Sequence, residues 1–275
     1  MPVSWYDLGT SMEFIEKLLS TSRRNRSLLC IGLDPDPELM PVTDIAQFNR
    51  AIIEATSDMV CAYKPNLAFY EALGTSGLAV LEETVKYIPD GVPVIADAKR
   101  GDIGSTAKAY ARALFSIFGF DAATVSPYLG YDSIEPFVSY EDKGVFILCR
   151  TSNRGARDFQ DLHTDGLPLY EVVARKAGEW NIRGNIGLVV GATYPEELKK
   201  VRSICPEMCL LIPGIGTQGG DLTSAVSYGV DARGERAVFN VSRQILYASK
   251  GQDYAGAARD MADRIRQQIN SHLTR

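Results

Sequence analysis

The strongest constraint on this chain is the alternation of short apolar segments with longer helical stretches along its length. Eight segments rich in aliphatic and β-branched residues are typical of buried strands, at 27–34, 60–66, 92–99, 122–127, 144–152, 185–193, 209–216 and 237–243. Helices are expected between or beside them at 44–58, 77–88, 104–118, 168–181, 195–204 and 221–228, and near the ends at 11–19 and 254–273. Strands that alternate with helices pair in parallel, so the pattern predicts a parallel sheet.

Eight such units leave two architectures open, a (β/α)8 barrel and an open doubly wound sheet. A (β/α)8 barrel typically needs about 250 residues, and this chain has 275. Polar and glycine residues repeatedly follow the strands, which is where a barrel gathers its functional loops. No Pro-rich or Gly/Ser-rich linker divides the chain. We therefore expect an α/β fold, a (β/α)8 TIM barrel that forms a single domain over residues 1–275.

Charge and hydropathy exclude several classes of function. The net charge is −5 and no block of like charge occurs, which argues against nucleic-acid or membrane-surface binding. The first 17 residues lack the apolar core of a signal peptide. No apolar run approaches the roughly 18 residues of a membrane span. We expect a cytoplasmic protein that has neither nucleic acid nor a membrane as its partner.

The five cysteines are scattered, and three of them lie inside apolar runs, where cysteine acts as a small hydrophobe. Cys205 and Cys209 are four residues apart but have no histidine or second cysteine pair nearby. A zinc site is therefore not expected. We predict reduced thiols and no bound metal.

The segment 97–103, Asp-Ala-Lys-Arg-Gly-Asp-Ile, directly follows the apolar run 92–96. Side chains alternate along a strand, so Asp97 and Lys99 share one face, and a turn at Gly101 is expected to bring Asp102 back toward the same ammonium. Nearby carboxylates favour the protonated form of a lysine, which makes Lys99 a fixed cation and a potential proton donor. The alternative for these residues alone is a buried salt-bridge network at the end of a strand.

Other expected strand ends also carry polar residues. Asp34 follows the first strand, and it is expected either to accept hydrogen bonds from a sugar or only to shape a turn. Lys64 ends the second strand, and Thr106 lies in the opening turn of a helix, where it also suits a helix cap. The residues around Ser152 are polar enough to hydrogen-bond the edge of a heterocycle, although an ordinary loop has a similar composition.

The stretch 213–221, Pro-Gly-Ile-Gly-Thr-Gln-Gly-Gly-Asp, has the glycine spacing of a dinucleotide-binding loop. Only one expected strand follows it, which leaves no room for a dinucleotide fold. A barrel instead places its phosphate site after strands seven and eight. Arg243, at the end of the eighth strand, can place two donors on a phosphate. We therefore predict a phosphate site at this stretch and Arg243, with 217–234 as a lid.

Taken together, these motifs resemble the orotidine 5′-monophosphate decarboxylase family. The resemblance depends on Asp-x-Lys-x-x-Asp-Ile at 97–103, Gly-Leu-Asp at 32–34, Lys64, the stretch 213–221 and Arg243, and it covers all eight expected strands. The context of Lys64 and the chain length are similar to the longer-chain bacterial branch. The resemblance implies conversion of orotidine 5′-monophosphate (OMP) to UMP and CO₂ by a homodimer, with no metal, flavin or pyridoxal cofactor.

The same resemblance implies a role for each site residue. Lys99 is the proton donor, and Asp97, Lys64 and Asp102 complete a charged array in which Asp102 comes from the partner subunit. The implied substrate contacts are Asp34 and Thr106 to the ribose, Ser152 to the pyrimidine, Gln218 and Arg243 to the phosphate, and Ile103 and Pro213 along the pocket wall.

Three rival functions remain open at this point. The first is a related barrel lyase that acts on a sugar phosphate, such as a keto-hexulose-phosphate decarboxylase, which shares the Asp-x-Lys-x-x-Asp run but usually needs Mg²⁺. The second is a Schiff-base aldolase that uses Lys64 or Lys99, although flanking carboxylates disfavour attack by an amine. The third is a non-catalytic protein that binds a nucleotide phosphate. Neither His163 nor His272 has a sequence context that indicates a catalytic base.

Overall fold

The computed structural model describes residues 13–215 and 221–273. Eight parallel strands form one sheet in the order β2-β1-β10-β9-β8-β5-β4-β3. Their bounds are β1 Leu29–Leu33, β2 Ala62–Pro65, β3 Ile95–Arg100, β4 Ala122–Val125, β5 Gly144–Arg150, β8 Ile186–Val190, β9 Cys209–Pro213 and β10 Ala237–Val241. Each strand overlaps one of the eight predicted segments.

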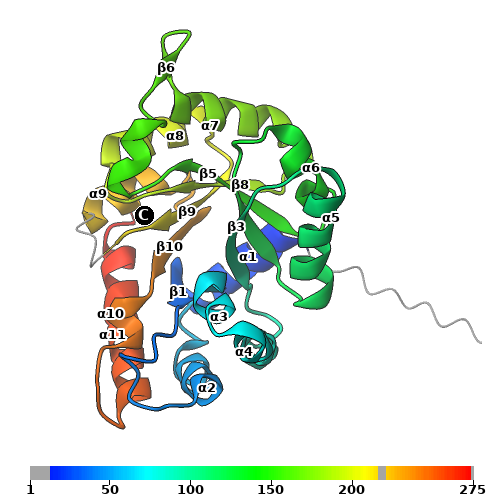
Figure 1. Ribbon diagram of the computed structural model, residues 1–275. Coiled ribbons are helices and arrows are strands. Elements are labelled where there is room, and N and C mark those ends of the chain that lie inside the picture. The colour runs from blue at the N-terminus through cyan, green and yellow to red at the C-terminus, as the bar shows by residue number, and fades with distance from the viewer. Residues whose placement is uncertain (1–12, 216–220, 274–275) are drawn as a thin grey trace, which may run out of the picture.

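The sheet closes on itself between its two end strands. Isolated parallel bridges join Tyr63 to Val94 and Asn66 to Asp97, and the Tyr63 amide donates to the Pro93 carbonyl at 2.9 Å. Helices surround the closed sheet (Figure 1). The prediction of a (β/α)8 barrel rather than an open sheet is therefore confirmed.

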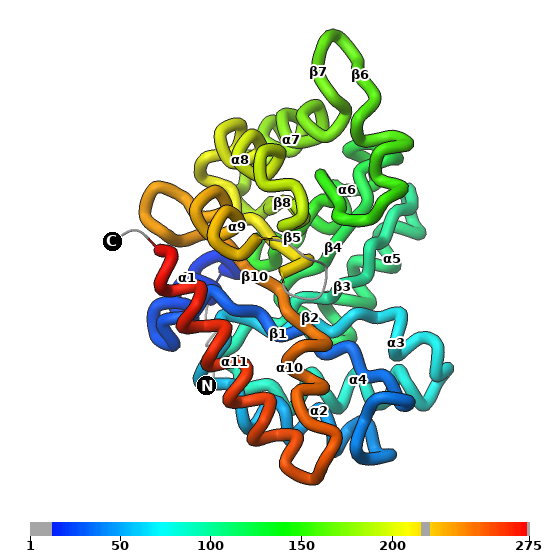
Figure 2. The backbone as a smooth tube through the Cα atoms, turned by 90° about the vertical axis from the view of Figure 1, so that its left-hand side faces the viewer, coloured from blue at the N-terminus to red at the C-terminus, as the bar shows by residue number. Residues whose placement is uncertain are grey.

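The helices cover the outside of the barrel. They are α1 Phe14–Asn25, α2 Ile45–Thr56, α3 Leu67–Glu71, α4 Gly74–Tyr87, α5 Gly104–Arg112, α6 Tyr131–Val138, α7 Leu169–Trp180, α8 Pro195–Ile204, α9 Leu222–Gly229, α10 Arg243–Leu246 and α11 Tyr254–Ser271. The last of them, α11, packs against α2 and so brings the end of the described chain beside its first quarter (Figure 2). The expected start of the first helix, at residue 11, lies outside the described residues.

Several elements differ from the predicted pattern. The helix expected at 104–118 is divided into α5 and a π-helical turn, η1, over Ala113–Ile117. The short helix α3, the Pro136-containing helix α6 and a hairpin formed by β6 (His163–Thr164) and β7 (Leu167–Pro168) were not predicted. These pieces are too short, or too interrupted by proline, to produce a helical or strand-like periodicity.

Helix α1 seals the amino end of the barrel. Its Phe14 ring meets Phe146 of β5 edge to face, with the ring centroids 5.8 Å apart. Gly144, the first residue of β5, leaves the space for this ring, because a Cβ there would overlap Phe14. Burial of these rings inside the barrel closes one end, so the carboxyl ends of the strands are left for a functional site.

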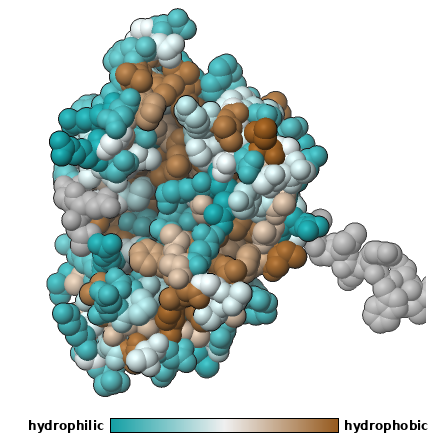
Figure 3. Space-filling view, viewed as in Figure 1, coloured by the Kyte–Doolittle hydropathy of each residue, from teal (hydrophilic) through white to brown (hydrophobic). Residues whose placement is uncertain are grey.

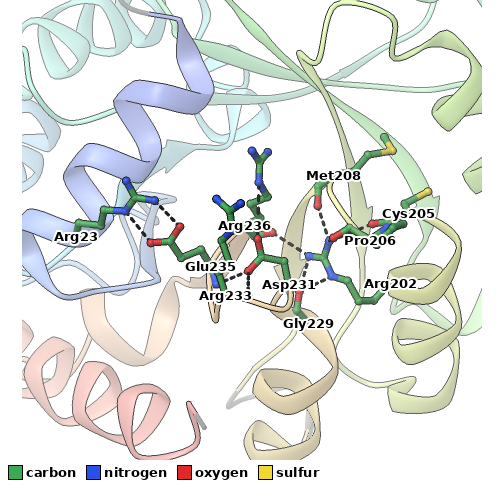
Figure 4. Close-up of polar contacts among 10 residues, drawn as sticks. All are labelled: Arg23, Arg202, Cys205, Pro206, Met208, Gly229, Asp231, Arg233, Glu235 and Arg236. Carbon is green, nitrogen blue, oxygen red and sulfur yellow. Dashed lines mark hydrogen bonds and ion pairs between the residues drawn. The ribbon is translucent and has the colours of Figure 1, made fainter. Parts of the chain in front are cut away.

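A half-buried arginine joins the elements of the amino end. Arg202, in the last turn of α8, donates to the backbone carbonyls of Gly229, Cys205, Pro206, Met208 and Arg236 at 2.6–3.2 Å (Figure 4). These carbonyls lie at the ends of α8 and α9 and at the starts of β9 and β10. The guanidinium therefore holds four elements in place.

The five cysteines are free and buried. Burial raises the pKa of Cys30 and of Cys209 to about 12, so both stay protonated at neutral pH and pack as small hydrophobes. Within residues 13–215 and 221–273, no three His, Cys, Asp or Glu side chains are placed to share a metal ion. In the same residues, no helix combines the length and the apolar character that a membrane span needs.

Candidate active site

A cluster of three charged side chains lies at the carboxyl ends of β2 and β3. The Asp97 carboxylate accepts a hydrogen bond from the Lys64 ammonium at 2.9 Å and another from the Lys99 ammonium at 2.6 Å. The Thr124 hydroxyl of β4 donates to the same carboxylate at 3.0 Å. We call Lys64, Asp97 and Lys99 the charged cluster.

The local backbone explains how two residues of one strand end reach each other. The pairing of β3 with β4 shifts between Ala96 and Arg100, which marks a bulge. Within it Lys99 has a left-handed conformation, with φ of +47°, and its amide donates to the Thr124 hydroxyl at 2.9 Å. Such a conformation costs a non-glycine residue about 1 kcal/mol or more, and it occurs most often where function requires it.

The cluster combines a buried ion pair with a more exposed ammonium. Lys64 is only 4% exposed. Burial by itself lowers the pKa of Lys64, but the charges of Asp97 and then Asp34 raise it well above its usual range. Burial likewise opposes ionisation of Asp97, yet Lys64 and Lys99 hold the pKa of that carboxyl well below its usual range. The Lys99 side chain is 51% exposed, so its ammonium is accessible to a ligand.

Two cavities adjoin at the charged cluster. The first has a volume of about 510 Å³ and the second about 460 Å³. Lys64, Asp97 and Pro213 line both cavities, whereas Lys99 lines the first and Arg243 the second. A ligand that fills both would therefore pass over the cluster.

The two cavities differ in chemistry. The first is walled by apolar side chains, Leu148, Val189 and Leu211 among them, and has a polar edge on the loop after β5, formed by Thr151, Ser152, Asn153 and Gln160. Hydrophobic surface lies below the β6–β7 hairpin and leads toward the middle of the same face (Figure 3). The second cavity is mostly polar and is lined by Asp34, Asn66, Asn240, Ser242, Arg243 and Gln244, with the backbone of Gly214. The first suits a flat ring, and the second suits hydroxyls and an anion.

Seven of the predicted site residues line these two cavities. They are Asp34, Lys64, Asp97, Lys99, Ser152, Pro213 and Arg243. Asp34 is held at the rim because its carboxylate accepts from the Asn66 amide at 3.2 Å. Residues from six different strand ends thus meet at one site.

Asp102, Ile103 and Thr106 are placed differently, because none of them lines either cavity. The Asp102 carboxylate accepts from the Ile103 amide at 2.8 Å, just before α5 begins. Within the described part of this chain, no ion pair joins Asp102 to Lys99, so the expected acid–lysine–acid cluster is instead a lysine–acid–lysine cluster. The Ile103 side chain is 53% exposed, and Thr106 is exposed too.

Gln218 lies outside the described residues, as does the first part of the lid expected at 217–234. The part that is described contains α9. Asp221 begins this helix, and its carboxylate accepts from the Thr223 and Ser224 amides at 3.1 and 3.3 Å. The glycine-rich stretch is therefore followed by a capped helix, as a phosphate loop in a barrel often is.

Three further residues of the site were missed in the sequence. Asn66 lines the second cavity, and its place directly after Lys64 and Pro65 at a strand end already indicated a site residue. Thr124 is a polar residue inside an apolar strand, a weaker signal of the same kind. Gln160 lies in a loop ten residues after the end of β5, and nothing in its surroundings indicates that it lines the cavity.

Comparison with known proteins agrees with this geometry. Residues 27–258 match the family described as orotidine 5′-phosphate decarboxylase / HUMPS. The chain belongs to this family. It is 57% identical over 269 residues to an orotidine 5′-phosphate decarboxylase of Dehalococcoides mccartyi, and the match covers 96% of this chain and 100% of that protein. The resemblance seen in the motifs is confirmed, and the assignment to a longer-chain bacterial branch stays a prediction.

Solved structures of the family have the same fold. An OMP decarboxylase structure from Leishmania donovani has a TM-score of 0.86 and 41% identity, and covers 95% of this chain and 99% of that one. A UMP synthase structure from the same organism has a TM-score of 0.88 and 43% identity. It matches 95% of this chain, which spans only 57% of the length of that larger protein.

Proposed function

We propose that this chain, a carboxy-lyase by its family, converts OMP to UMP and CO₂ in pyrimidine biosynthesis and needs no metal or organic cofactor. The observation that carries this proposal is the position of the charged cluster between an apolar cavity and a polar one. In OMP the C6 carboxylate also stands between a flat ring and a ribose phosphate. The match of the chain to relatives named orotidine 5′-phosphate decarboxylase supports the same substrate.

The apolar cavity, the charged cluster and the polar cavity each accommodate one part of the substrate. The pyrimidine enters the first cavity, where Ser152 meets its polar edge and Pro213 lines the wall. The ribose lies beside Asp34, and Arg243 binds the phosphate, with Gln218 as the second phosphate ligand expected from the sequence. The C6 carboxylate then faces the charged cluster.

The anionic member of the cluster favours loss of CO₂. Two like charges about 4 Å apart repel by roughly 4 kcal/mol at an effective dielectric of 20. Asp97 is held ionised by Lys64 and Lys99, so it cannot easily escape this repulsion by taking up a proton. The repulsion is relieved when the substrate carboxylate leaves as neutral CO₂.

Lys99, the more exposed of the two cationic members, supplies the proton. When the bond from C6 to the carboxylate breaks, the electron pair stays on C6, where no adjacent carbonyl can delocalise it. The Lys99 ammonium stabilises this developing charge and then gives it a proton. The neutral amine that results recovers a proton from solvent, which the 51% exposure of its side chain permits.

Asp102, Ile103 and Thr106 complete the site of a partner subunit. Their placement supports this, since Ile103 and Thr106 are exposed, Asp102 is half-buried, and none of the three lines either cavity. In a homodimer these residues reach the neighbouring Lys99, with Asp102 acting in trans. A mixture of Lys99→Ala and Asp102→Ala chains should then recover about a quarter of the activity of the native enzyme, because random pairing yields one intact site in half of the dimers. No recovery in mixed dimers would contradict the arrangement.

The remote phosphate contributes binding energy rather than chemistry. A contact made far from the reacting carbon can hold the ring and its carboxylate against the charged cluster. Arg243 is suited to this, because its planar guanidinium can bind two phosphate oxygens at once.

The deciding experiment follows the loss of OMP ultraviolet absorbance with EDTA present, for the native chain and for Lys99→Ala. We expect fast turnover by the first and almost none by the second. Activity abolished by EDTA would instead favour a Mg²⁺-dependent sugar-phosphate lyase. A covalent adduct trapped by borohydride would favour a Schiff-base aldolase, and binding of UMP without turnover of OMP would leave only a nucleotide binder.

A further inference from the structure

Arg150 is a buried charged residue beside the first cavity that the mechanism above does not use. It ends β5 and is only 1% exposed. Its guanidinium lies 4.1 Å from the centre of the Tyr194 ring and pairs with Asp161 at 3.1 Å. Glu197 of α8 adds a longer contact of 3.8 Å. Burying a guanidinium is costly, so a residue held in this way calls for an explanation.

The guanidinium controls the orientation of a cavity residue. It donates to the side-chain oxygen of Gln160 at 3.3 Å, and the Thr151 amide donates to the same oxygen at 2.9 Å. Two donors at one oxygen determine which end of the Gln160 amide is the carbonyl. The NH₂ group must therefore point the other way, and it donates to the Thr151 hydroxyl at 2.8 Å.

The hydrogen bonds continue in one direction along the loop. Because the Thr151 hydroxyl accepts from Gln160, its own proton is free to donate, and it does so to the side-chain oxygen of Asn153 at 2.6 Å. Gln160, Thr151 and Asn153 all line the first cavity. Within the described residues, the second proton of the Gln160 NH₂ group has no acceptor.

We propose that Gln160 is a specificity-determining residue that donates this proton to a carbonyl oxygen of the pyrimidine, and that Arg150 is the positioning residue that keeps the donor facing the cavity. The inference rests on the proposed function, which places the ring in this cavity. The ring atom farthest from the ribose is C4, so its carbonyl reaches deepest toward the loop. The Gln160 NH₂ group donates a hydrogen bond to that carbonyl.

This geometry separates two kinds of pyrimidine. A uracil-type ring has an acceptor at C4, whereas a cytosine-type ring has an amino group that donates. Two donors that face each other leave both unpaired in a desolvated site. The native chain should therefore bind UMP at least about tenfold more tightly than CMP.

The test compares UMP and CMP affinity by titration calorimetry in native protein and in Gln160→Met and Gln160→Glu. Gln160→Met should weaken UMP binding about tenfold and change CMP binding less than threefold, since it removes the donor but keeps the length. Gln160→Glu should invert the preference, because a carboxylate accepts from the amino group of CMP and repels the carbonyl of UMP. Gln268→Met, on the exposed face of α11, is the matched control. An unchanged UMP-to-CMP ratio in Gln160→Met would overturn the proposal.

The positioning role is tested separately with Arg150→Lys, which keeps the charge but loses the planar donor set. We expect the UMP-to-CMP ratio to fall toward that of Gln160→Met, with the KM for OMP rising about tenfold and kcat changing less than threefold. A ratio equal to the native one would show that Arg150 does not position Gln160. Should Arg150→Lys not fold, the Gln160 variants still decide the donor role. Native protein that selects UMP but never decarboxylates OMP would overturn the proposed function and leave this inference standing.

Discussion

The two ends of the barrel use charged residues in opposite ways. At the carboxyl end, Lys64, Asp97 and Lys99 pair with one another around two open cavities. At the amino end, Arg202 donates all of its hydrogen bonds to backbone carbonyls, and Phe14 fills the remaining space. The carboxyl end thus keeps its charges available to a ligand, whereas the amino end uses its charge to join elements of the fold.

Left-handed backbone occurs at both ends of the barrel, at Arg236 just before β10 and at Lys99 in β3, but only Lys99 of these two lines a cavity. Lys99 adopts this conformation next to a bulge in β3. Strain of this kind persists where the surrounding structure imposes it, often for function. Substitutions of the accessible carboxyl-end residues Lys99 and Arg243 should reduce activity with little loss of stability, and substitution of Arg202 at the amino end should do the reverse.

The largest effect is expected for Lys99→Ala. It removes both the cation that stabilises charge at C6 and the proton donor, so kcat should fall by about 10³-fold or more. The midpoint of urea unfolding should stay close to that of the native chain, because Asp97 keeps Lys64 as a partner. Lys250→Ala, at an exposed position, serves as the control. A large drop in the unfolding midpoint would show that Lys99 supports the fold as Arg202 does.

Arg202→Met tests the other end of the barrel. It removes the Arg202 donor from the carbonyls of Gly229 and Met208, whereas the Arg236 carbonyl keeps the Leu210 amide, so the free energy of unfolding should fall by about 3 kcal/mol. Urea denaturation measures this loss, with Arg264→Met on the exposed face of α11 as the control. The protein that remains folded should keep its native kcat/KM for OMP. A tenfold loss of kcat/KM in fully folded protein would break the division between the two ends.

Arg243→Ala tests whether Arg243 contributes to substrate binding or to the chemical step. Loss of a charge-assisted contact to phosphate costs about 2 kcal/mol, or roughly 30-fold in kcat/KM for OMP. The nucleoside orotidine lacks the phosphate, so its turnover should differ less than twofold between the variant and the native chain. If orotidine turnover fell by the same factor, Arg243 would act on the reacting carbon and not on the phosphate.

The difference between the two ends also explains what could be predicted from the sequence. A buried strand must be apolar, so all eight strands were visible as apolar segments. A polar residue that directly follows such a segment has few structural reasons to be there, which is why Asp34, Lys64, Asp97 and Arg243 were found. The carboxyl ends of neighbouring strands then brought these residues together.

Contacts to backbone atoms leave no comparable signal. Any residue can supply the carbonyls that Arg202 binds, so nothing in the sequence of its partners indicates the contact. Gln160 likewise depends on Arg150 and on a loop conformation rather than on a strand end. The role expected for Asp102 inside its own chain differs from the structure because the start of α5 satisfies that carboxylate locally.

The smallest expected effect is the change of unfolding free energy with pH. For the native chain, the Lys64–Asp97 pair should cause almost no such change near neutral pH. Asp97 has a lowered pKa in the folded state, so its contribution is present above the unfolded value of about 3.9 and is lost only as pH falls below it. Lys64 has a raised pKa, so its contribution is present below about 10.4 and is lost only as pH rises above it. The pair therefore contributes a constant amount between pH 6 and 9, and the unfolding free energy should be flat there as far as this pair is concerned.

In Asp97→Asn the unfolding free energy should no longer be constant between pH 6 and 9 but should rise with pH. Without the neighbouring carboxylate, burial dominates at Lys64 and its pKa falls below that of the unfolded chain. The unfolded state then binds more protons than the folded state, so stability rises with pH, by about 1–2 kcal/mol from pH 6 to 9. Urea denaturation at several pH values measures the slope, and Glu82→Gln, which breaks the exposed pair with Lys86 on α4, should leave it at the native value. A flat profile for Asp97→Asn would mean that Lys64 is stabilised by other groups, and that the carboxyl end is less dependent on its own ion pairs than the comparison with Arg202 implies.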